Sequence, residues 1–357
     1  MRSLDIIESP EDWDASLLAL PDPHVLQSST WGALKSKQGW HPTRLLWSEA
    51  GRPLAAAQIL IQQRGRLRLG YIAKGPLVDW ANLPLVDEVL SRLEIYARDH
   101  GLLLLKIDPD VRRDTMPGLA GVSLLRWHGW RESREQIQFC NTMVLDLRPS
   151  LDTLMEQMKS KWRYNIRLAV RRGVTVREAQ ESELPALYDM YAKTADRGNF
   201  TVREKPYYMV AWRQFMQANL AVPLVAEIEG EPLAMVVLLH FGERAWYMYG
   251  ASRARHRQLM PNHLLQWEAI RRAKALGCTT YDLWGAPDML DERDPLWGVY
   301  RFKQGFGAAF VPHIGAYDYT PKLWLYRIYH FLRPRAVMLA HRRYWAEVEA
   351  AGEHDAL

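Results

Sequence analysis

The chain has 357 residues, of which 48% are hydrophobic and 24% are charged, and its formal net charge is +5. This balance is typical of a globular protein, and the length favours two domains. The two cysteines are too few for a disulfide framework, and no apolar run approaches the length that spans a bilayer. The mild positive charge permits a polyanionic partner without requiring one.

The N-terminal segment MRSLDIIESPEDWD is acidic and has no apolar core. A secretory signal peptide needs a basic start and an apolar stretch, so none is predicted. We therefore expect a cytoplasmic protein.

The first half of the chain predicts a repeating unit. Residues 51–61 (GRPLAAAQILI) and 69–76 (LGYIAKGP) are strand-like, and residues 83–99 predict a helix. The helix ends before Gly101, and a buried strand then closes on Asp108.

The same order of elements recurs in the second half. Residues 230–240 (GEPLAMVVLLH) and 246–252 (WYMYGAS) predict strands, residues 262–276 a helix, and the next strand closes on Asp282. Because the matches keep a nearly constant offset, they indicate duplication of one α/β unit. We expect a first domain at residues 1–147, a second at 148–312, and residues 313–357 packed on the first.

A hairpin, a helix and a further strand resemble the GNAT-like acyltransferase fold. That fold holds the pyrophosphate of acetyl-CoA with backbone N–H groups of a glycine-rich loop. The corresponding loop here, RARHRQLMPNHL, has no glycine, and its Pro261 has no N–H to donate. The sequence therefore predicts an α/β protein with mixed sheets and two tandem GNAT-like domains that lack a coenzyme A cradle.

The sequence lacks the motifs that mark several other reaction chemistries. The sequence contains no GxxxxGK[ST] phosphate loop, HExxH, paired CxxC or GxSxG elbow. We expect no metal and no cofactor.

A basic segment follows the expected domain boundary. Residues 150–172 predict one helix with Ser150 as its N-cap and an apolar stripe along its length. Beside that stripe the cations repeat every four residues, at Lys159, Arg163, Arg167 and Arg171. Two interpretations stay open at this point: a solvated face near the negative end of the helix dipole, or contact with a polyanion.

Several motifs together resemble the Fem family of peptidyltransferases, in its short form without a coiled-coil insertion. They are VLQSSTWGALKSKQGW, YIAKGPLVD, LKIDPDV, KWRYNIRLAVRRGVTV, TADRGNFTVREKPYY, WYMYGAS, YDLWG and GVYRFKQGFGA, and they span nearly the whole chain. The resemblance implies transfer of an amino acid from aminoacyl-tRNA to the stem peptide of a UDP- or lipid-linked peptidoglycan precursor. It also implies that the basic stripe contacts the tRNA.

The resemblance also implies the site residues. The precursor's diphosphate and sugar are expected at Lys37, Arg203, Tyr207 and Tyr249, whose alternative roles are surface solvation for the cations and core packing for the phenols. Arginine offers a bidentate fork to phosphate, lysine a point charge, and phenols donate without adding charge. Asp108 either orients the acceptor amine or caps a turn.

The segment YRFKQGFG carries the expected reaction centre. By resemblance, Lys303 acts on the donor tRNA and the developing oxyanion, while Phe302 shapes the reaction site. If the segment is a strand, alternation places these two side chains on opposite faces, unless Gly305 and Gly307 introduce a bend.

The C-terminal segment 321–345 mixes large apolar side chains with arginines. It predicts either a basic amphipathic helix at an anionic membrane surface, which would place the protein at the inner face of the membrane, or a helix packed on the first domain. We expect a monomer. Two other functions remain as alternatives: a coenzyme A dependent N-acyltransferase and a non-catalytic RNA-binding module.

Overall fold

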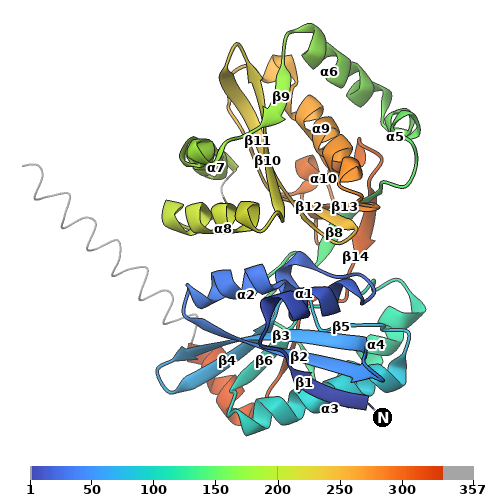
Figure 1. Cartoon of the computed structure of the whole chain (residues 1–357), viewed down its shortest axis with the longest axis vertical. Coiled ribbons are helices and arrows are strands. Elements are labelled where there is room, and N and C mark those ends of the chain that lie inside the picture. The colour runs from blue at the N-terminus through green and yellow to red at the C-terminus, as the bar shows by residue number, and fades with distance from the viewer. Residues whose placement is uncertain (1, 199, 333–357) are drawn as a thin grey trace, which may run out of the picture.

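The computed structural model describes residues 2–198 and 200–332. Within these ranges the strands form two mixed sheets, one in each half of an elongated molecule (Figure 1). The first half lies at the bottom of the view and the second at the top.

The first sheet has eight strands in the order β1-β2-β3-β4-β6-β15-β7, with β5 beside β3. Its strands are β1 (Arg2–Ile6), β2 (Trp40–Glu49), β3 (Arg52–Arg64), β4 (Leu67–Ile72), β5 (Leu77–Val78), β6 (Leu104–Ile107), β7 (Arg131–Glu132) and β15 (Tyr317–Tyr319). One face packs on α1 (Pro10–Leu18), η1 (Val25–Gln27) and α2 (Ser29–Ser36), and the other on α3 (Leu83–Asp99) and α4 (Met116–Trp127).

The second sheet has seven strands in the order β14-β8-β13-β12-β11-β10-β9. They are β8 (Asn141–Asp146), β9 (Thr175–Glu178), β10 (Ala221–Ile228), β11 (Glu231–Phe241), β12 (Arg244–Ser252), β13 (Thr280–Gly285) and β14 (Ala309–Pro312). One face packs on α5 (Leu151–Gln157), α6 (Ser160–Arg171) and α9 (Pro261–Ala275), and the other on α7 (Leu184–Gly198) and α8 (Lys205–Gln217). Further helices are η2 (Glu181–Glu183), η3 (Arg257–Leu259), α10 (Trp297–Gln304) and one at residues 323–332.

The predicted duplication is confirmed by the matching order of elements. In the first half, β3 pairs with β4, α3 follows, and β6 returns parallel to β4. In the second half, β11 pairs with β12, α9 follows, and β13 returns parallel to β12. Helix α3 has the bounds predicted from the sequence, and α9 differs from its prediction by one residue at each end.

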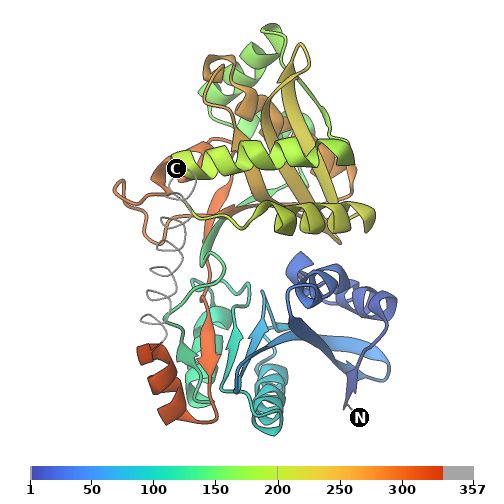
Figure 2. The same cartoon turned by 90° about the vertical axis from the view of Figure 1, so that its left-hand side faces the viewer.

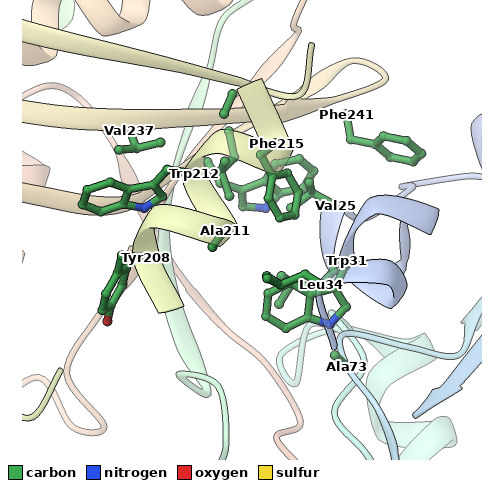
Figure 3. Packing of buried hydrophobic residues seen from close by; sticks show 14 of the residues in the cluster. Val25, Trp31, Leu34, Ala73, Tyr208, Ala211, Trp212, Phe215, Val237 and Phe241 are labelled. Atoms are coloured by element: carbon green, nitrogen blue, oxygen red, sulfur yellow. The ribbon is translucent and has the colours of Figure 1, made fainter. Parts of the chain in front are cut away.

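The two halves share one hydrophobic core. Helix α2 of the first half faces α8 of the second, and Figure 3 shows their side chains side by side. The buried contributors include Trp31 and Leu34 from α2 and Trp212 and Phe215 from α8. Because a buried Trp or Phe removes a large apolar area from water, this core joins the halves into one body.

A buried carboxylate also joins the halves. Asp110, which follows β6, lies 3.0 Å from Nζ of Lys74 and 3.4 Å from a guanidinium nitrogen of Arg244. The imidazoles of His24 and His313 each approach it to 3.7 Å. Although burial alone would raise it, the charge of Lys74 and of the groups around it holds the pKa of Asp110 well below its ordinary value.

The basic segment departs from the prediction of a single helix. Ser150 is the N-cap, as predicted, but α5 ends at Gln157 and α6 begins only at Ser160. Between them Met158 is extended and buried, and the N–H of Lys159 donates to the carbonyl of Gly305. The bond to a distant segment replaces a helical one, which breaks the helix at this point.

The expected domain boundary after residue 147 stays a prediction, and one strand bears on it. Strand β8 precedes that boundary yet is hydrogen-bonded between β13 and β14 of the second sheet. At the other end of the chain, β15 returns to the first sheet between β6 and β7.

A helix at residues 323–332 follows β15 and lies beside the first sheet (Figure 2). Tyr326 is buried against Leu69 and Leu104, and its hydroxyl donates to Asp318. Asp318 also pairs with the buried Lys106 at 2.8 Å. Among the described helices, none is long and apolar enough to cross a membrane.

Candidate functional site

A cavity of about 840 Å³ lies where the two sheets face each other. In the second sheet, the parallel strands β12 and β13 pair only as far as Trp246 and Asp282 and then separate. The side chains beyond that point, Tyr247, Tyr249 and Trp284, line the cavity. The cavity therefore occupies the gap between two diverging parallel strands, closed on its far side by the first sheet.

Lys303 reaches this cavity from α10, a helix where the sequence had suggested a strand. The side chain is 4% exposed, and its Nζ donates to the carbonyl oxygens of Trp284 at 2.8 Å and Gly285 at 2.6 Å. Trp284 has a left-handed backbone with a φ of +61°, a strained conformation for a bulky residue. Two of the three ammonium hydrogens are thus donated to carbonyls, and within residues 2–198 and 200–332 no third acceptor lies within hydrogen-bond distance.

Burial controls the charge of Lys303. Desolvation lowers the pKa of its amine to about 7, and the carboxylate of Asp282 only partly opposes this effect. At neutral pH the uncharged amine is therefore far more populated than in an ordinary surface lysine.

Phe302 lies on the other face of α10 and does not line the cavity. Its ring contacts His263 at 5.3 Å and Phe306 at 5.1 Å between centroids. The structure therefore separates Phe302 from Lys303, because adjacent residues of a helix point in different directions.

A second group of predicted residues comes together at another part of the cavity. The guanidinium of Arg203 lies 4.8 Å from the ring centre of Tyr207, and Tyr249 lies in the same aromatic cluster. Arg203, Tyr207 and Tyr249 were all proposed from the sequence as ligands of the precursor. Their convergence provides one cation and two phenols on one wall.

Lys35, which the sequence analysis did not propose, also lines the cavity beside this group. Its Nζ lies 4.2 Å from the ring centre of Trp31 and 5.5 Å from that of Tyr207. Desolvation, and then repulsion from Arg203, lowers the pKa of Lys35 to about 8. Among the described residues, neither Lys35 nor Arg203 is within ion-pair distance of a carboxylate, so the pair leaves positive charge uncompensated where a ligand would lie.

Lys37, the lysine proposed from the sequence, lies outside the cavity. It is the C-cap of α2, it is exposed, and its Nζ donates to Gln214 of α8 at 2.9 Å. A signal was available, because Lys35 follows Trp31 by four residues and so shares its helix face.

Asp108 is buried and reaches the cavity only through another residue. It accepts hydrogen bonds from the Tyr71 hydroxyl at 2.7 Å and from the Lys74 N–H at 2.5 Å. Burial raises the pKa of Asp108 to about 6. Tyr71, and not Asp108, lines the cavity.

The four cations of the basic segment divide into two pairs. Lys159 donates to Gln304, and Arg163 donates to the carbonyls of Glu156 and Met158, so these two make structural contacts. Arg167 and Arg171 are exposed on α6, whose other face packs on the second core. The basic surface thus lies on the second half, separate from the cavity walls.

The chain matches the FemAB family over residues 11–117, 123–229 and 225–333. Curated relatives include the lipid II:glycine glycyltransferases of Staphylococcus epidermidis, 25% identical with 90% of this chain and 94% of the relative covered, and of Staphylococcus aureus, 24% identical with 91% and 94% covered.

Solved structures show the same fold. A crystal structure of FemX superposes with a TM-score of 0.83 at 22% identity, covering 91% of this chain and 99% of that one. A tandem GNAT protein from the clavulanic acid biosynthesis pathway superposes with a TM-score of 0.54 at 13% identity, covering 90% and 98%. The tandem GNAT-like architecture is therefore confirmed, and by the extent of the family match the chain belongs to the FemAB family.

Proposed function

We propose that this protein is an aminoacyltransferase that moves an amino acid from aminoacyl-tRNA to the stem-peptide amine of a peptidoglycan precursor, acting as a monomer. The names of the staphylococcal relatives support a role in building peptidoglycan bridges. The observation that carries the proposal is one cavity that holds both an uncompensated cationic pair, Lys35 and Arg203, and the buried amine of Lys303.

The chemistry follows from the bonds exchanged. The acceptor amine attacks the aminoacyl ester, a C–N bond forms, the ester C–O bond breaks, and the amine proton ends on the departing ribose oxygen. Between these events the carbonyl oxygen carries a negative charge, and the free hydrogen of Lys303 is available to stabilise it. Lys35, Arg203, Tyr207 and Tyr249 hold the precursor's phosphates and sugar.

The remaining predicted residues take supporting roles. Asp108 orients the Tyr71 hydroxyl, which meets the acceptor peptide at the cavity wall. Arg167 and Arg171 contact phosphates of the tRNA from the outer face of α6.

The direct test combines charged tRNA, a nucleotide-linked or lipid-linked precursor and mass spectrometry of the stem peptide. Wild-type protein should add one aminoacyl residue. Lys303→Met should lower kcat on the order of a hundredfold, as expected for loss of an oxyanion donor, while precursor affinity stays within about threefold. A variant that keeps more than half of the turnover would remove Lys303 from the mechanism, and no product with any charged tRNA would refute the proposal.

The cationic pair Lys35 and Arg203 predicts that substituting Lys35 weakens precursor binding more than substituting Lys37, its neighbour at the end of α2. Lys35→Met should weaken binding of the nucleotide-linked precursor by about ten- to a hundredfold, because a charged hydrogen bond to phosphate is lost. Lys37→Met is the matched control and should change affinity by less than about twofold, since its contact is exposed. Calorimetry that ranks the two variants in the opposite order would restore Lys37 to the site.

The basic surface predicts a salt effect on tRNA. Arg167→Ala with Arg171→Ala should raise the KM for charged tRNA and flatten its dependence on salt by about one unit per lost contact. The KM for the precursor should not change, and Arg52→Ala, an exposed cation of the other half, should leave both constants alone. A salt titration identical to wild type would show that these arginines only face solvent.

The C-terminal segment predicts membrane contact at the inner face. Residues 333–345 of that segment lie outside the described residues, but the helix 323–332 exposes Trp324 and Ile328 at 63% and 46%, spaced by one turn. Trp324→Glu with Ile328→Glu should reduce flotation with anionic vesicles, because both side chains would lose their apolar contact with the lipid. Trp127→Glu, on the exposed face of α4, is the control and should float as wild type does. Equal flotation of all three proteins would exclude this surface.

A further inference from the structure

Helix α10 is held at its C-terminal end by the first turn of α6. The last carbonyls of a helix have no partner within it, and that of Phe302 accepts a hydrogen bond from the indole Nε1–H of Trp162 at 3.0 Å. Gln304, the last residue of α10, accepts a hydrogen bond from Nζ of Lys159 at 2.6 Å. The N–H of Lys159 donates to the Gly305 carbonyl at 2.9 Å.

The fit between Trp162 and Gly305 leaves no room for a side chain. A Cβ added to Gly305 would lie 2.1 Å from the indole of Trp162. Gly305 has a right-handed backbone with a φ of −65°, so its conformation does not require glycine. Glycine is required instead by the lack of space, because the indole lies directly against the backbone at the end of α10.

The opposite face of α10 carries Lys303. While the Phe302 ring packs against His263 and Phe306, the Lys303 side chain points into the cavity and donates to two carbonyls of β13. The position of Nζ therefore depends on where α10 lies, and that is fixed at one end by Trp162.

We propose that Trp162 is a positioning residue for Lys303, so that the first turn of the basic helix sets the geometry and solvation of the amine in the cavity. The inference rests on the proposed function for its catalytic consequence, but its structural claim can be measured separately. Helix α6 also exposes Arg167 and Arg171, so the basic surface and the contact that holds α10 belong to one helix.

The first measurement follows the ionisation of Lys303 without turnover. A pulse of an amine-acylating reagent at increasing pH, read by peptide mass spectrometry, gives the midpoint at which Lys303 becomes reactive. The groups that face the amine are the Asp282 carboxylate and the Tyr247 ring, and neither is altered by a change at Trp162. Desolvation depresses the pKa in the native site, so a loosened α10 that admits water should move the midpoint upward toward the ordinary value.

Trp162→Phe keeps an aromatic ring and removes the N–H donor, and Gly305→Ala forces the indole away from α10. Both variants should raise the midpoint by about half a pH unit or more. Both should lower kcat by about fivefold, as for one lost hydrogen bond, with the KM for the precursor unchanged. Tyr164→Phe, an exposed neighbour on α6, is the matched control and should match wild type in every measurement.

The outcomes separate the two claims. If both variants remain folded by circular dichroism and keep the wild-type midpoint, Trp162 does not position Lys303 and the inference fails. If the midpoints shift while Lys303→Met retains turnover, the positioning stands and the catalytic role of Lys303 fails. Should Trp162→Phe not fold, the Gly305→Ala midpoint alone decides the inference.

Discussion

The arrangement of the two halves depends on the ion pairs that buried Asp110 makes with Lys74 and Arg244. The carboxylate of Asp110 lies in the interior at the junction, where one lysine from the first half and one arginine from the second approach it. Two cations facing each other in a low-dielectric interior would repel strongly, and the carboxylate makes their proximity favourable. The same lysine, Lys74, lies 5.6 Å from the ring centre of Trp284. Trp284 is also the residue whose carbonyl accepts a hydrogen bond from Lys303. The ion pairs at the junction and the geometry of the cavity therefore both involve the surroundings of Trp284.

Duplication explains why the cavity has two unlike walls. Each half contributes a pair of parallel strands, but only the second pair diverges around the buried amine. The first half supplies Lys35, Tyr71 and the floor below them. The second half contributes both Lys303 and the group of Arg203, Tyr207 and Tyr249, and the first half closes the cavity opposite them. Under the proposed function a loop that cradles pyrophosphate is unnecessary, because Lys35 and Arg203 offer cationic side chains to an anionic group between the halves.

The sequence predicted the features that depend on local pattern. Repeated strand–helix–strand segments predicted the duplication, and the helical segment that ends before Gly101 predicted α3 with its observed bounds. Arg203, Tyr207 and Tyr249, which the resemblance named as ligands of the precursor, lie together at one wall of the cavity, and their binding role stays a prediction. The errors arose where distant contacts decide the outcome. The break before α6 depends on the hydrogen bond from Lys159 to the Gly305 carbonyl. The helix that contains Phe302 and Lys303 depends on Trp162, whose indole N–H bonds a carbonyl at its end. Lys35 and Lys37 differ only in which side of α2 they occupy, a distinction that motif matching ignores and helix geometry supplies.

Strand β15 has a consequence for how the chain matures. It is the last described strand in the sequence, yet it lies inside the first sheet, between β6 and β7. During synthesis, β6 and β7 leave the ribosome long before their partner does, roughly ten to forty seconds earlier at an elongation rate of about 5–20 residues per second. For that interval the nascent first half carries an unpaired strand edge, which is a template for pairing with other chains. Completion of the first sheet must await the synthesis of β15, so until then the edges of β6 and β7 can pair with other strands.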